Sequence, residues 1–261
     1  MSPLLVSILW LGGIGLLCGV ALAIAARYFS VKEDPRIAEV EGFLSGANCG
    51  GCGFAGCGDY AKAIVEKGAP TNLCVATDAE AIKKIAAIMG VEAGEVVKRR
   101  AVVLCQGTRT ASKRRFSYNG LTDCAAAAAT AGGDKACTFG CLGYGSCARV
   151  CPAHAITVED GLARVNPAIC GGCGKCASVC PRGLIALVPV DAKVAVLCKS
   201  KAKGAVVRQQ CSAGCIGCTL CTKLVPGMFK MDGALATVDY ANAADPAAAV
   251  AKCPGKCIRE I

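Results

Sequence analysis

The feature that most constrains the fold of this 261-residue chain is its 22 cysteines, most of which stand in short, closely spaced groups. The clearest group is the run Cys170-x2-Cys173-x2-Cys176-x3-Cys180-Pro181. Such a run places three thiolates on one [4Fe–4S] cube and sends the fourth to a neighbouring cube. A secreted disulfide scaffold is the alternative for a cysteine-rich chain. The repeated C-x2-C pairs argue against it, because two ligands on one tight loop suit a metal, and they indicate a reducing compartment.

The composition also favours folding around metal. Aromatic residues make up only 5% of the chain, and glycine and proline contribute 32 and 10 residues, so a conventional hydrophobic core is thin. Small domains of this kind usually need metals or cross-links to hold together. Thiolate ligation would supply part of the folding free energy, since such a site does not exist in the unfolded chain. The length leaves room for two or three small domains.

The first segment predicts a membrane anchor at residues 1–26. Residues 3–26 contain no charged residue, and about 20 apolar residues suffice for a helix to cross a bilayer. A cleaved signal peptide is the alternative, with Ala23-Ile24-Ala25 as a passable cleavage site. It is disfavoured because no Lys or Arg precedes the apolar run and cleavage would export the thiolates. Arg27 and Lys32 follow the helix, so the positive-inside rule predicts a single-pass protein of the inner membrane with its C-terminal body in the cytoplasm.

The net charge argues against nucleic acid as a partner. The formal charge is +10 with neutral cysteines, but an oxidised cube with its four thiolates carries roughly −2. Four such cubes would leave the chain nearly balanced, at about +2, which gives nucleic-acid binding no good support. Two local basic runs remain, at residues 98–100 and 109–115. These runs could attract an acidic redox partner or contact anionic lipid. The alternative is that they are only a solvated surface.

Hydrophobic periodicity predicts a small helical domain over residues 27–92. Helices are expected at 36–44, 58–68 and 78–89, and the apolar residues of the last recur at helical spacing. These helices are short and flank the first group of cysteines. The domain is therefore expected to wrap around one metal site.

The remainder predicts an α+β fold with a weak internal repeat. Residues 96–104 and 193–197 are strand-like, and each segment runs up to a cysteine, Cys105 or Cys198. Each is followed by a polar or basic segment and then by a C-x3-C pair. Alanine-rich helices are expected at 125–131 and 241–251. We therefore expect tandem ferredoxin-like domains, with two clusters at 93–192 and a one-cluster half-ferredoxin at 193–261.

Four cysteines in the helical domain predict one [4Fe–4S] centre. Their spacing is C-x2-C-x4-C-x16-C, and the glycines around them let the backbone wrap a bulky cube. Structural zinc is the alternative for four thiolates, but the neighbouring ferredoxin-type runs imply iron. Gly51-x-Gly53-x2-Gly56 formally matches a dinucleotide fingerprint and is rejected, since it precedes no convincing βαβ unit. The predicted ligands are Cys49, Cys52, Cys57 and Cys74.

Two further centres with crossed ligation are predicted in the central domain. The first run departs from the standard spacing, because Tyr144 stands where the middle cysteine is expected. Cys137, just upstream, can replace it. Crossed ligation also holds the two cubes close together, as electron hopping requires. One cube is expected on Cys137, Cys141, Cys147 and Cys180, and the other on Cys151, Cys170, Cys173 and Cys176.

A fourth centre is predicted near the C-terminus, where Val225 replaces the last cysteine of the run and leaves half a ferredoxin. Its expected ligands are Cys215, Cys218, Cys221 and Cys253. Of the six cysteines that remain, Cys18 is an apolar filler of the first helix. The others form a fifth cluster or are buried structural thiols, and we favour the thiols; they are Cys105, Cys124, Cys198, Cys211 and Cys257. The expected cofactors are four [4Fe–4S] clusters, within a range of three to five.

No catalytic constellation is visible in the sequence. His154 is the only histidine, so a heme or a His-ligated zinc site is not expected, and no acid–base or nucleophilic arrangement can be traced. The sequence offers no recognisable flavin or nicotinamide site. The chain is therefore expected to move electrons without an active site of its own.

The order of these parts closely resembles the B subunit of the Rnf complex, the membrane ferredoxin:NAD⁺ oxidoreductase. The resemblance covers essentially the whole chain and includes the DCAAAA stretch at 123–128 and CxxGCLGYGSCxxVCP from Cys137. It implies an electron-relay subunit of an ion-translocating enzyme, with soluble reduced ferredoxin and the other Rnf subunits as partners. Flavin-bearing partners would then reduce NAD⁺ and drive Na⁺ or H⁺ out of the cell.

Two other functions fit parts of the pattern. An anchored polyferredoxin of a membrane hydrogenase or formate-type complex would also carry tandem motifs, but the four-cysteine domain before them favours Rnf. A zinc-stapled membrane adaptor would be colourless, whereas an iron–sulfur protein is brown. The shorter members of the Rnf family carry only the first cluster domain and one ferredoxin pair, so the half-ferredoxin is an extension of this chain.

Overall fold

The structure, a computed structural model, describes residues 3–28, 34–94, 98–242 and 244–261. The chain begins with α1 (Pro3–Tyr28), whose side chains are described for residues 10–25, 27 and 28. Within the described residues, no helix is both long enough and apolar enough to be identified as a membrane span. The anchor at residues 1–26 therefore stays a prediction. Lys32, one of its two basic flanking residues, lies outside the described part of the chain.

Three helices form the unit that follows: α2 (Pro35–Phe43), α3 (Cys57–Lys67) and α4 (Ala79–Met89). Each begins and ends within one residue of its predicted bounds. The Asp34 side chain caps α2, and glycines in the left-handed conformation close α3 and α4. The helices pack around a shared core, whose most deeply buried large side chains are Val40, Tyr60, Ile64 and Ile85.

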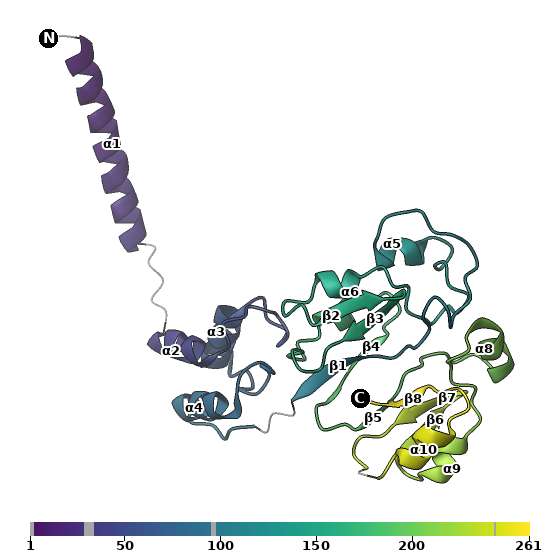
Figure 1. The fold of residues 1–261 in the computed structure, drawn as a ribbon. Helices are drawn as coiled ribbons and strands as arrows, with labels where there is room; N and C mark the ends of the chain where they lie inside the picture. Colours follow the sequence, from purple (N-terminus) through teal and green to yellow (C-terminus); the bar gives the residue numbers. More distant parts are fainter. Residues whose placement is uncertain (1–2, 29–33, 95–97, 243) are drawn as a thin grey trace.

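The central unit consists of two antiparallel strand pairs and three short helices (Figure 1). The outer pair joins β1 (Arg99–Val103) to β4 (Ile185–Pro189). Between these two strands along the chain lies a hairpin of β2 (Ile156–Glu159) and β3 (Leu162–Val165). The helices are α5 (Cys124–Ala129), α6 (Ser146–Arg149) and α7 (Lys175–Ser178). Residues 96 and 97 of the predicted first strand lie outside the described residues.

The C-terminal unit repeats this arrangement. Its outer pair is β5 (Val194–Val196) with β8 (Ile258–Glu260), and its hairpin is β6 (Phe229–Asp232) with β7 (Leu235–Val238). The helices are α8 (Gly204–Gln210), α9 (Leu220–Leu224) and α10 (Ala247–Lys252). The mixture of helix and strand in both units confirms the predicted α+β class.

The predicted helix at 241–251 is wrong in its first half, because α10 begins only at Ala247. Pro246 sits at the start of α10 and disfavours helical geometry at the residue before it. Further upstream, the Asp239 side chain accepts the N–H of Ala241, and the Asp239 carbonyl accepts the N–H of Asn242. These bonds form a turn where alanine propensity alone favours helix.

The central and C-terminal units meet along a bonded junction, and Figure 1 shows them side by side. The N–H of Ser212 donates to the carbonyl of Ala111, and the N–H of Lys113 donates to the carbonyl of Gln210, both at 2.9 Å. These bonds are antiparallel in sense, as in a short piece of sheet. They hold the cysteine-bearing loops of one unit against those of the other.

A glycine two residues after the first cysteine recurs in all three ferredoxin-type runs. Gly143, Gly172 and Gly217 have φ angles of 77°, 69° and 69°, a conformation that other residues rarely adopt. In each case a Cβ would come closer than 3.0 Å to a main-chain carbonyl oxygen, which for Gly172 belongs to Arg99 of β1. The tight turn around each metal site and the close approach of the chain therefore both require glycine.

We expect Gly172→Ala to destabilise the cluster-loaded protein more than Gly233→Ala does. Gly233 lies in the β6–β7 turn with a similar φ of 62°, but open space surrounds the position of its Cβ. Both changes carry the left-handed penalty of about 1–2 kcal/mol, and only Gly172→Ala adds a clash with backbone. Thermal unfolding under anaerobic conditions measures the difference, and equal losses in Tm would show that the approach of β1 is unimportant.

Candidate metal centres

The first predicted group of ligands lies where the chain enters α3. Cys57 starts this helix, and both Cys57 and Cys74 are buried. The Thr77 hydroxyl donates to the Cys74 sulfur at 3.2 Å. Burial raises the pKa of the Cys52 thiol, and the nearby thiols of Cys74 and Cys49 raise it further. The structure thus brings Cys49 and Cys74 near Cys52, and Cys57 belongs to the same hydrophobic core as Cys52 and Cys74.

Tyr60 and Asn48 fix the loops that carry these cysteines. The Tyr60 side chain is buried, its hydroxyl donates to the carbonyl of Pro70 at 2.6 Å, and it accepts the N–H of Leu73 at 3.1 Å. These two bonds tie the long loop before Cys74 to α3. The Asn48 side chain accepts the N–H of Cys57 at 2.7 Å and holds the other end of the site.

A second group lies against β1. Its members are the predicted ligands Cys151, Cys170, Cys173 and Cys176, which line one cavity together with Cys49 of the helical unit. The N–H of Ala101 donates to the Cys170 sulfur at 3.4 Å. Burial raises the pKa of Cys176 to about 11, and the other three thiols of the group add to the shift. Main-chain donors aimed at sulfur suit an iron–sulfur cluster, whose ligands stay negatively charged.

In the third group the structure places Cys124, rather than Cys137, beside the other predicted ligands. Cys141, Cys147 and Cys180 line one cavity, and Cys124 at the start of α5 completes it. Burial raises the pKa of Cys147 to about 12, and the other three thiols raise it further. Cys137 lines a separate cavity.

A polar network holds Cys124 against the helix that carries Cys147. Asp123 caps α5, and its second carboxylate oxygen accepts the Ser146 hydroxyl at 2.8 Å. The N–H of Cys124 donates to the same hydroxyl at 2.8 Å, and Arg149 pairs with Asp123 at 2.9 Å. Ser146 and Arg149 are the two ends of α6, so this network fixes Cys124 at the edge of the cavity.

One feature of the sequence points to Cys124 as a ligand, but the shorter distance of Cys137 from Cys141 along the chain favours Cys137 instead. Asp123 is a strong helix cap before an alanine run, which predicts a fixed helix start at Cys124. Cys137 lies only four positions before Cys141, whereas Cys124 lies 17 positions before it. Counting along the chain therefore favours Cys137, although Arg182 holds its loop elsewhere by donating to the Cys137 carbonyl at 2.8 Å.

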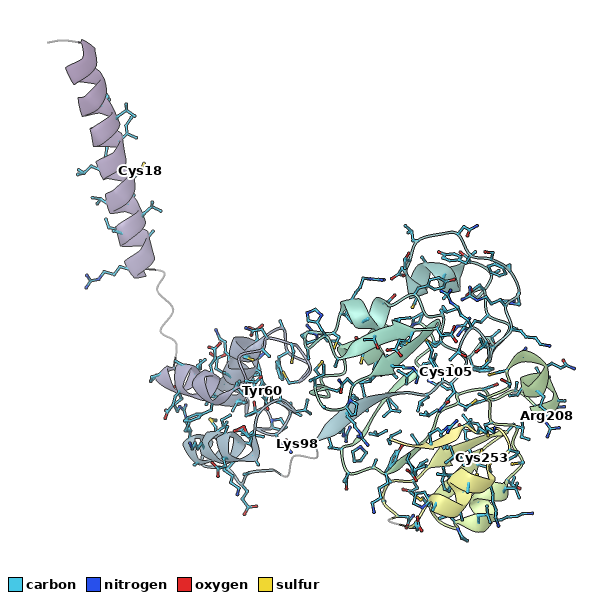
Figure 2. The ribbon with its side chains drawn as sticks, viewed as in Figure 1. Cys18, Tyr60, Lys98, Cys105, Arg208 and Cys253 are labelled. Carbon is cyan, nitrogen blue, oxygen red and sulfur yellow. The ribbon has the colours of Figure 1, made fainter. Side chains whose placement is uncertain are left out.

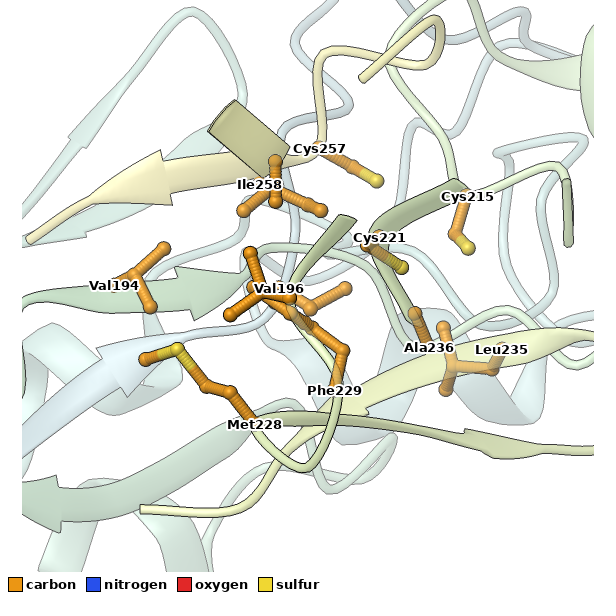
Figure 3. Close-up of a cluster of buried hydrophobic side chains, with 12 residues drawn as sticks. Val194, Val196, Cys215, Cys221, Met228, Phe229, Leu235, Ala236, Cys257 and Ile258 are labelled. Atoms are coloured by element: carbon orange, nitrogen blue, oxygen red, sulfur yellow. The ribbon is translucent and has the colours of Figure 1, made fainter. Parts of the chain in front are cut away.

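The fourth group lies in the C-terminal unit. Its cavity is lined by the predicted ligands Cys215, Cys218, Cys221 and Cys253, and by Cys257. Figure 3 shows Cys215, Cys221 and Cys257 close together at the edge of the hydrophobic core of this unit. The Cys257 thiol hydrogen-bonds to Cys215 and Cys253, which lowers the pKa of Cys215 to about 6 and that of Cys253 to about 5, and raises the pKa of Cys257.

The position of Cys257 within the motif indicates a core residue. In each ferredoxin-type motif the last cysteine is followed by proline and, four positions on, by a buried residue: Ala155 after Cys151, Leu184 after Cys180 and Cys257 after Cys253. In the first two motifs the N–H of that buried residue donates to the cysteine sulfur, at 3.3 and 3.4 Å. In the third, the main chain of Cys257 helps to lower the pKa of Cys253. Cys257 thus occupies a place that its two counterparts fill with an apolar side chain.

One more cavity is lined by several cysteines, at the junction of the central and C-terminal units. They are Cys105, Cys137, Cys198 and Cys211. Of the 22 cysteines, this leaves Cys18, exposed on α1, and Cys257 outside the groups of four. Across residues 3–28, 34–94, 98–242 and 244–261, no three or more His, Cys, Asp or Glu side chains are placed so that they could hold a single metal ion.

The cysteine groups and the units that carry them indicate the class: an iron–sulfur protein of mixed helix and strand. Comparisons with known proteins agree. A family model described as "Putative Fe-S cluster" matches residues 44–76. A second, described as "LdpA Fe-S cluster-binding domain", matches residues 137–190.

Comparison with named relatives assigns the chain to a family within this class. The chain is 42% identical to the B subunit of the ion-translocating oxidoreductase complex of Methanosarcina acetivorans, over 98% of both chains. It is also 42% identical to the B subunit of the Na⁺-translocating ferredoxin:NAD⁺ oxidoreductase complex of Acetobacterium woodii, over 99% of this chain and 78% of that one. The proton-translocating counterpart of Clostridium ljungdahlii is 40% identical, over 95% and 89%. The chain belongs to the B-subunit family of Rnf complexes, which confirms the resemblance seen in the sequence.

We expect Cys253→Ser to remove about four iron atoms per chain and Cys257→Ala to remove none. The reason is that Cys253 occupies the ligand position, whereas alanine already stands at the counterpart of Cys257. Iron and acid-labile sulfide, measured on anaerobically purified protein, give the answer. Iron loss in Cys257→Ala with full loading of Cys253→Ser would make Cys257 the ligand.

Proposed function

We propose that this chain is the electron-relay subunit of an Rnf-type complex, accepting electrons from reduced ferredoxin and passing them on toward NAD⁺ reduction coupled to Na⁺ or H⁺ translocation. The observation that carries the proposal is a succession of cavities, each lined by four or more cysteines. Bound cubes exchange single electrons, so a row of them needs no catalytic group in this chain. The relatives, named as subunits of ferredoxin:NAD⁺ oxidoreductases, support this function.

Four [4Fe–4S] centres are assigned to the groups described above. Centres 1, 2 and 4 take the ligands predicted from the sequence, and centre 3 takes Cys124 in place of Cys137. Centre 1 is held by Cys49, Cys52, Cys57 and Cys74, and centre 2 by Cys151, Cys170, Cys173 and Cys176. Centre 3 is held by Cys124, Cys141, Cys147 and Cys180, and centre 4 by Cys215, Cys218, Cys221 and Cys253.

Neighbouring centres share parts of their surroundings. Cys49 of centre 1 lines the cavity of centre 2, and a Cβ at Gly51 would lie only 2.7 Å from the carbonyl oxygen of Cys173. Cys176 of centre 2 is near enough to Cys147 of centre 3 to raise its pKa, after burial and the nearer thiols. An electron on centre 3 can therefore pass through centre 2 to centre 1, the centre next to the N-terminal helix in the sequence.

Ferredoxin is proposed to dock on the C-terminal unit. Cys218 is the exposed member of the predicted ligands, whereas the others are half-buried or buried. Residues 193–261 carry ten Lys and Arg against four Asp and Glu, which favours an acidic partner. Lys252 lines the mouth of centre 4, and Lys223 is exposed on α9.

The two basic runs noted in the sequence are partly engaged within the fold. Arg100 and Arg115 donate to main-chain carbonyls. Arg114 pairs at 2.6 Å with Asp134, whose side chain is fully buried. Lys98 and Lys113 stay exposed, so these runs offer fewer charges to a partner than the sequence indicates.

Charge reversal at Lys223 and Lys252 should slow cluster reduction by reduced ferredoxin roughly tenfold at low salt and little at high salt, because salt screens steering between exposed charges. Stopped-flow absorbance of the full chain in detergent measures the rate. Lys98→Glu with Lys113→Glu is the matched control, since it changes the net charge equally.

A larger effect in that control would move the docking surface to the basic runs of the central unit. If reduced ferredoxin fails to reduce any cluster of the unmodified chain, the proposed function itself is refuted. Iron content measured on every variant separates slow electron transfer from cluster loss.

The proposal includes a single-pass anchor at residues 1–26 in the inner membrane, with the C-terminal body in the cytoplasm beside the other Rnf subunits. The uncharged run at 3–26 and the following Arg27 support it. The helical conformation of α1 through these residues also supports it. A cytoplasmic body would also meet soluble ferredoxin and keep its thiols reduced.

Deleting residues 1–28 should release the chain from the membrane fraction with its iron content unchanged, because the predicted ligands all lie beyond residue 48. Fractionation of cells that express either form measures this. In inverted vesicles, protease should reach the body of the full-length chain. A full-length chain found in the soluble fraction, or a body protected in inverted vesicles, would contradict the anchor or its orientation.

A further inference from the structure

Four cysteines that centres 1 to 4 do not use line one cavity at the junction of the two ferredoxin-like units: Cys105, Cys137, Cys198 and Cys211. Figure 2 shows Cys105 where the two units meet. We propose that these thiols hold a fifth [4Fe–4S] cluster, centre 5, between centres 3 and 4. The site itself is inferred from the thiols and their surroundings, and its role in the relay rests on the proposed function.

The internal repeat supplies the four thiols in matched pairs. Cys105 follows β1 and Cys198 follows β5, so the two occupy equivalent places after the first outer strand of each unit. Cys137 and Cys211 each stand four positions before the first cysteine of a ferredoxin-type run. Each unit therefore contributes the same two positions, and the main-chain bonds of the junction bring the pairs face to face.

Main-chain N–H groups already point at these sulfur atoms. The Cys105 sulfur accepts the N–H of Gly107 and the N–H of Cys141, each at 3.3 Å. Burial raises the pKa of Cys198 to about 11, and the N–H groups of the two counterpart positions, Ser200 and Cys215, oppose this shift. Main-chain donors also serve ligand sulfurs of centres 2 and 3. Such donors stabilise a thiolate bound to iron, and a thiol that merely fills a core has no need of them.

A buried cation provides a second, independent observation. Lys135 is 0% exposed, and its ammonium donates to the carbonyls of Gly107 and Gly161. Within the described residues no carboxylate pairs with it, and a charge removed from water needs an anion nearby. Lys135 lies close to both Cys141 and Cys211, where it opposes the effect of burial on their pKa. Negatively charged cubes at centres 3 and 5 would supply the missing anions.

The arrangement of the thiols favours a cube over a zinc ion. Four cysteines line the junction cavity, as four line that of centre 3 and five that of centre 4. Zinc draws four sulfurs to about 2.3 Å from one ion, and within the described residues no three His, Cys, Asp or Glu side chains are placed to hold a single metal ion. The junction cavity is therefore suited to the same group as its neighbours.

Centre 5 makes the relay continuous between the two units. The N–H of Cys141, a ligand of centre 3, donates to the Cys105 sulfur at 3.3 Å. On the other side, Cys215 of centre 4 is near enough to Cys198 to raise its pKa, after burial. The junction cavity thus lies beside ligands of both centres. With cubes held by these cysteines, each centre would take up one electron, changing from 2+ to 1+, and return to 2+ on passing it to the next, in the order 4, 5, 3. No bond is made or broken.

The cluster count of the full chain, purified anaerobically in detergent and reconstituted with iron and sulfide, tests the proposal. Native mass spectrometry should show five cubes, and chemical analysis about 20 iron and 20 sulfide per chain without zinc. Serine at Cys105, Cys137, Cys198 or Cys211 should each remove about four iron, and the same EPR signal. Cys124→Ser should remove a different signal, and Cys18→Ser none.

Two results would overturn centre 5. One is four cubes in the unmodified chain with unchanged iron in the four junction variants. The other is about 16 iron with one zinc that disappears when Cys198 or Cys211 is replaced, since this is a structural zinc site. If the variants fail to fold, the count in the unmodified chain still separates five cubes from four. Five cubes in a chain that ferredoxin does not reduce would leave centre 5 standing and refute the relay.

Discussion

Hydrogen bonds from main-chain N–H groups to cysteine sulfur recur at the ferredoxin-type sites, and the fold is organised to supply them. They come from strands, as at Ala101 of β1, and from the residue four positions after each Cys-Pro step, as at Ala155 and Leu184. Several of these sulfur atoms are also buried and close to one another. Burial and the neighbouring thiols raise the pKa of Cys147 to about 12. Bound iron removes this conflict, because it stabilises the thiolate that burial disfavours. Cluster binding is therefore expected to supply part of the folding free energy of this chain.

Positively charged residues occupy two kinds of place in the molecule, the interior near the proposed centres and the outer surface. The interior near centres 3 and 5 holds Lys135 and the half-buried Arg182, whose guanidinium donates to main-chain carbonyls around Cys137. The outer surface of the C-terminal unit instead carries exposed lysines. Buried cations offset the negative cubes, whereas exposed ones attract an acidic partner. The nearly neutral total expected for the loaded chain thus conceals two separate roles for positive residues.

Local rules predicted the parts of this fold that depend on local interactions. The three helices of the first unit lie within one residue of their expected bounds because caps and glycines mark their ends. Motif spacing likewise predicted the groups of ligands in which three cysteines of one loop are joined by a single distant cysteine. Spacing failed to separate Cys124 from Cys137, because the choice depends on the contacts of Asp123 with α6. The internal repeat of the sequence contains the four cysteines of the junction cavity, but local rules could not bring them together, since they belong to four separate segments.

The junction also imposes an order on the making of the protein. Its cysteines span positions 105 to 211, so the first two leave the ribosome well before the last two. The helical unit has all its thiols early, and the central unit receives its own by Cys180. The shared site must wait for the second unit, with half its sulfur already in place. During synthesis the first pair of junction thiols therefore waits for the second pair, and only the C-terminal unit, which needs Cys253 and β8, is completed later.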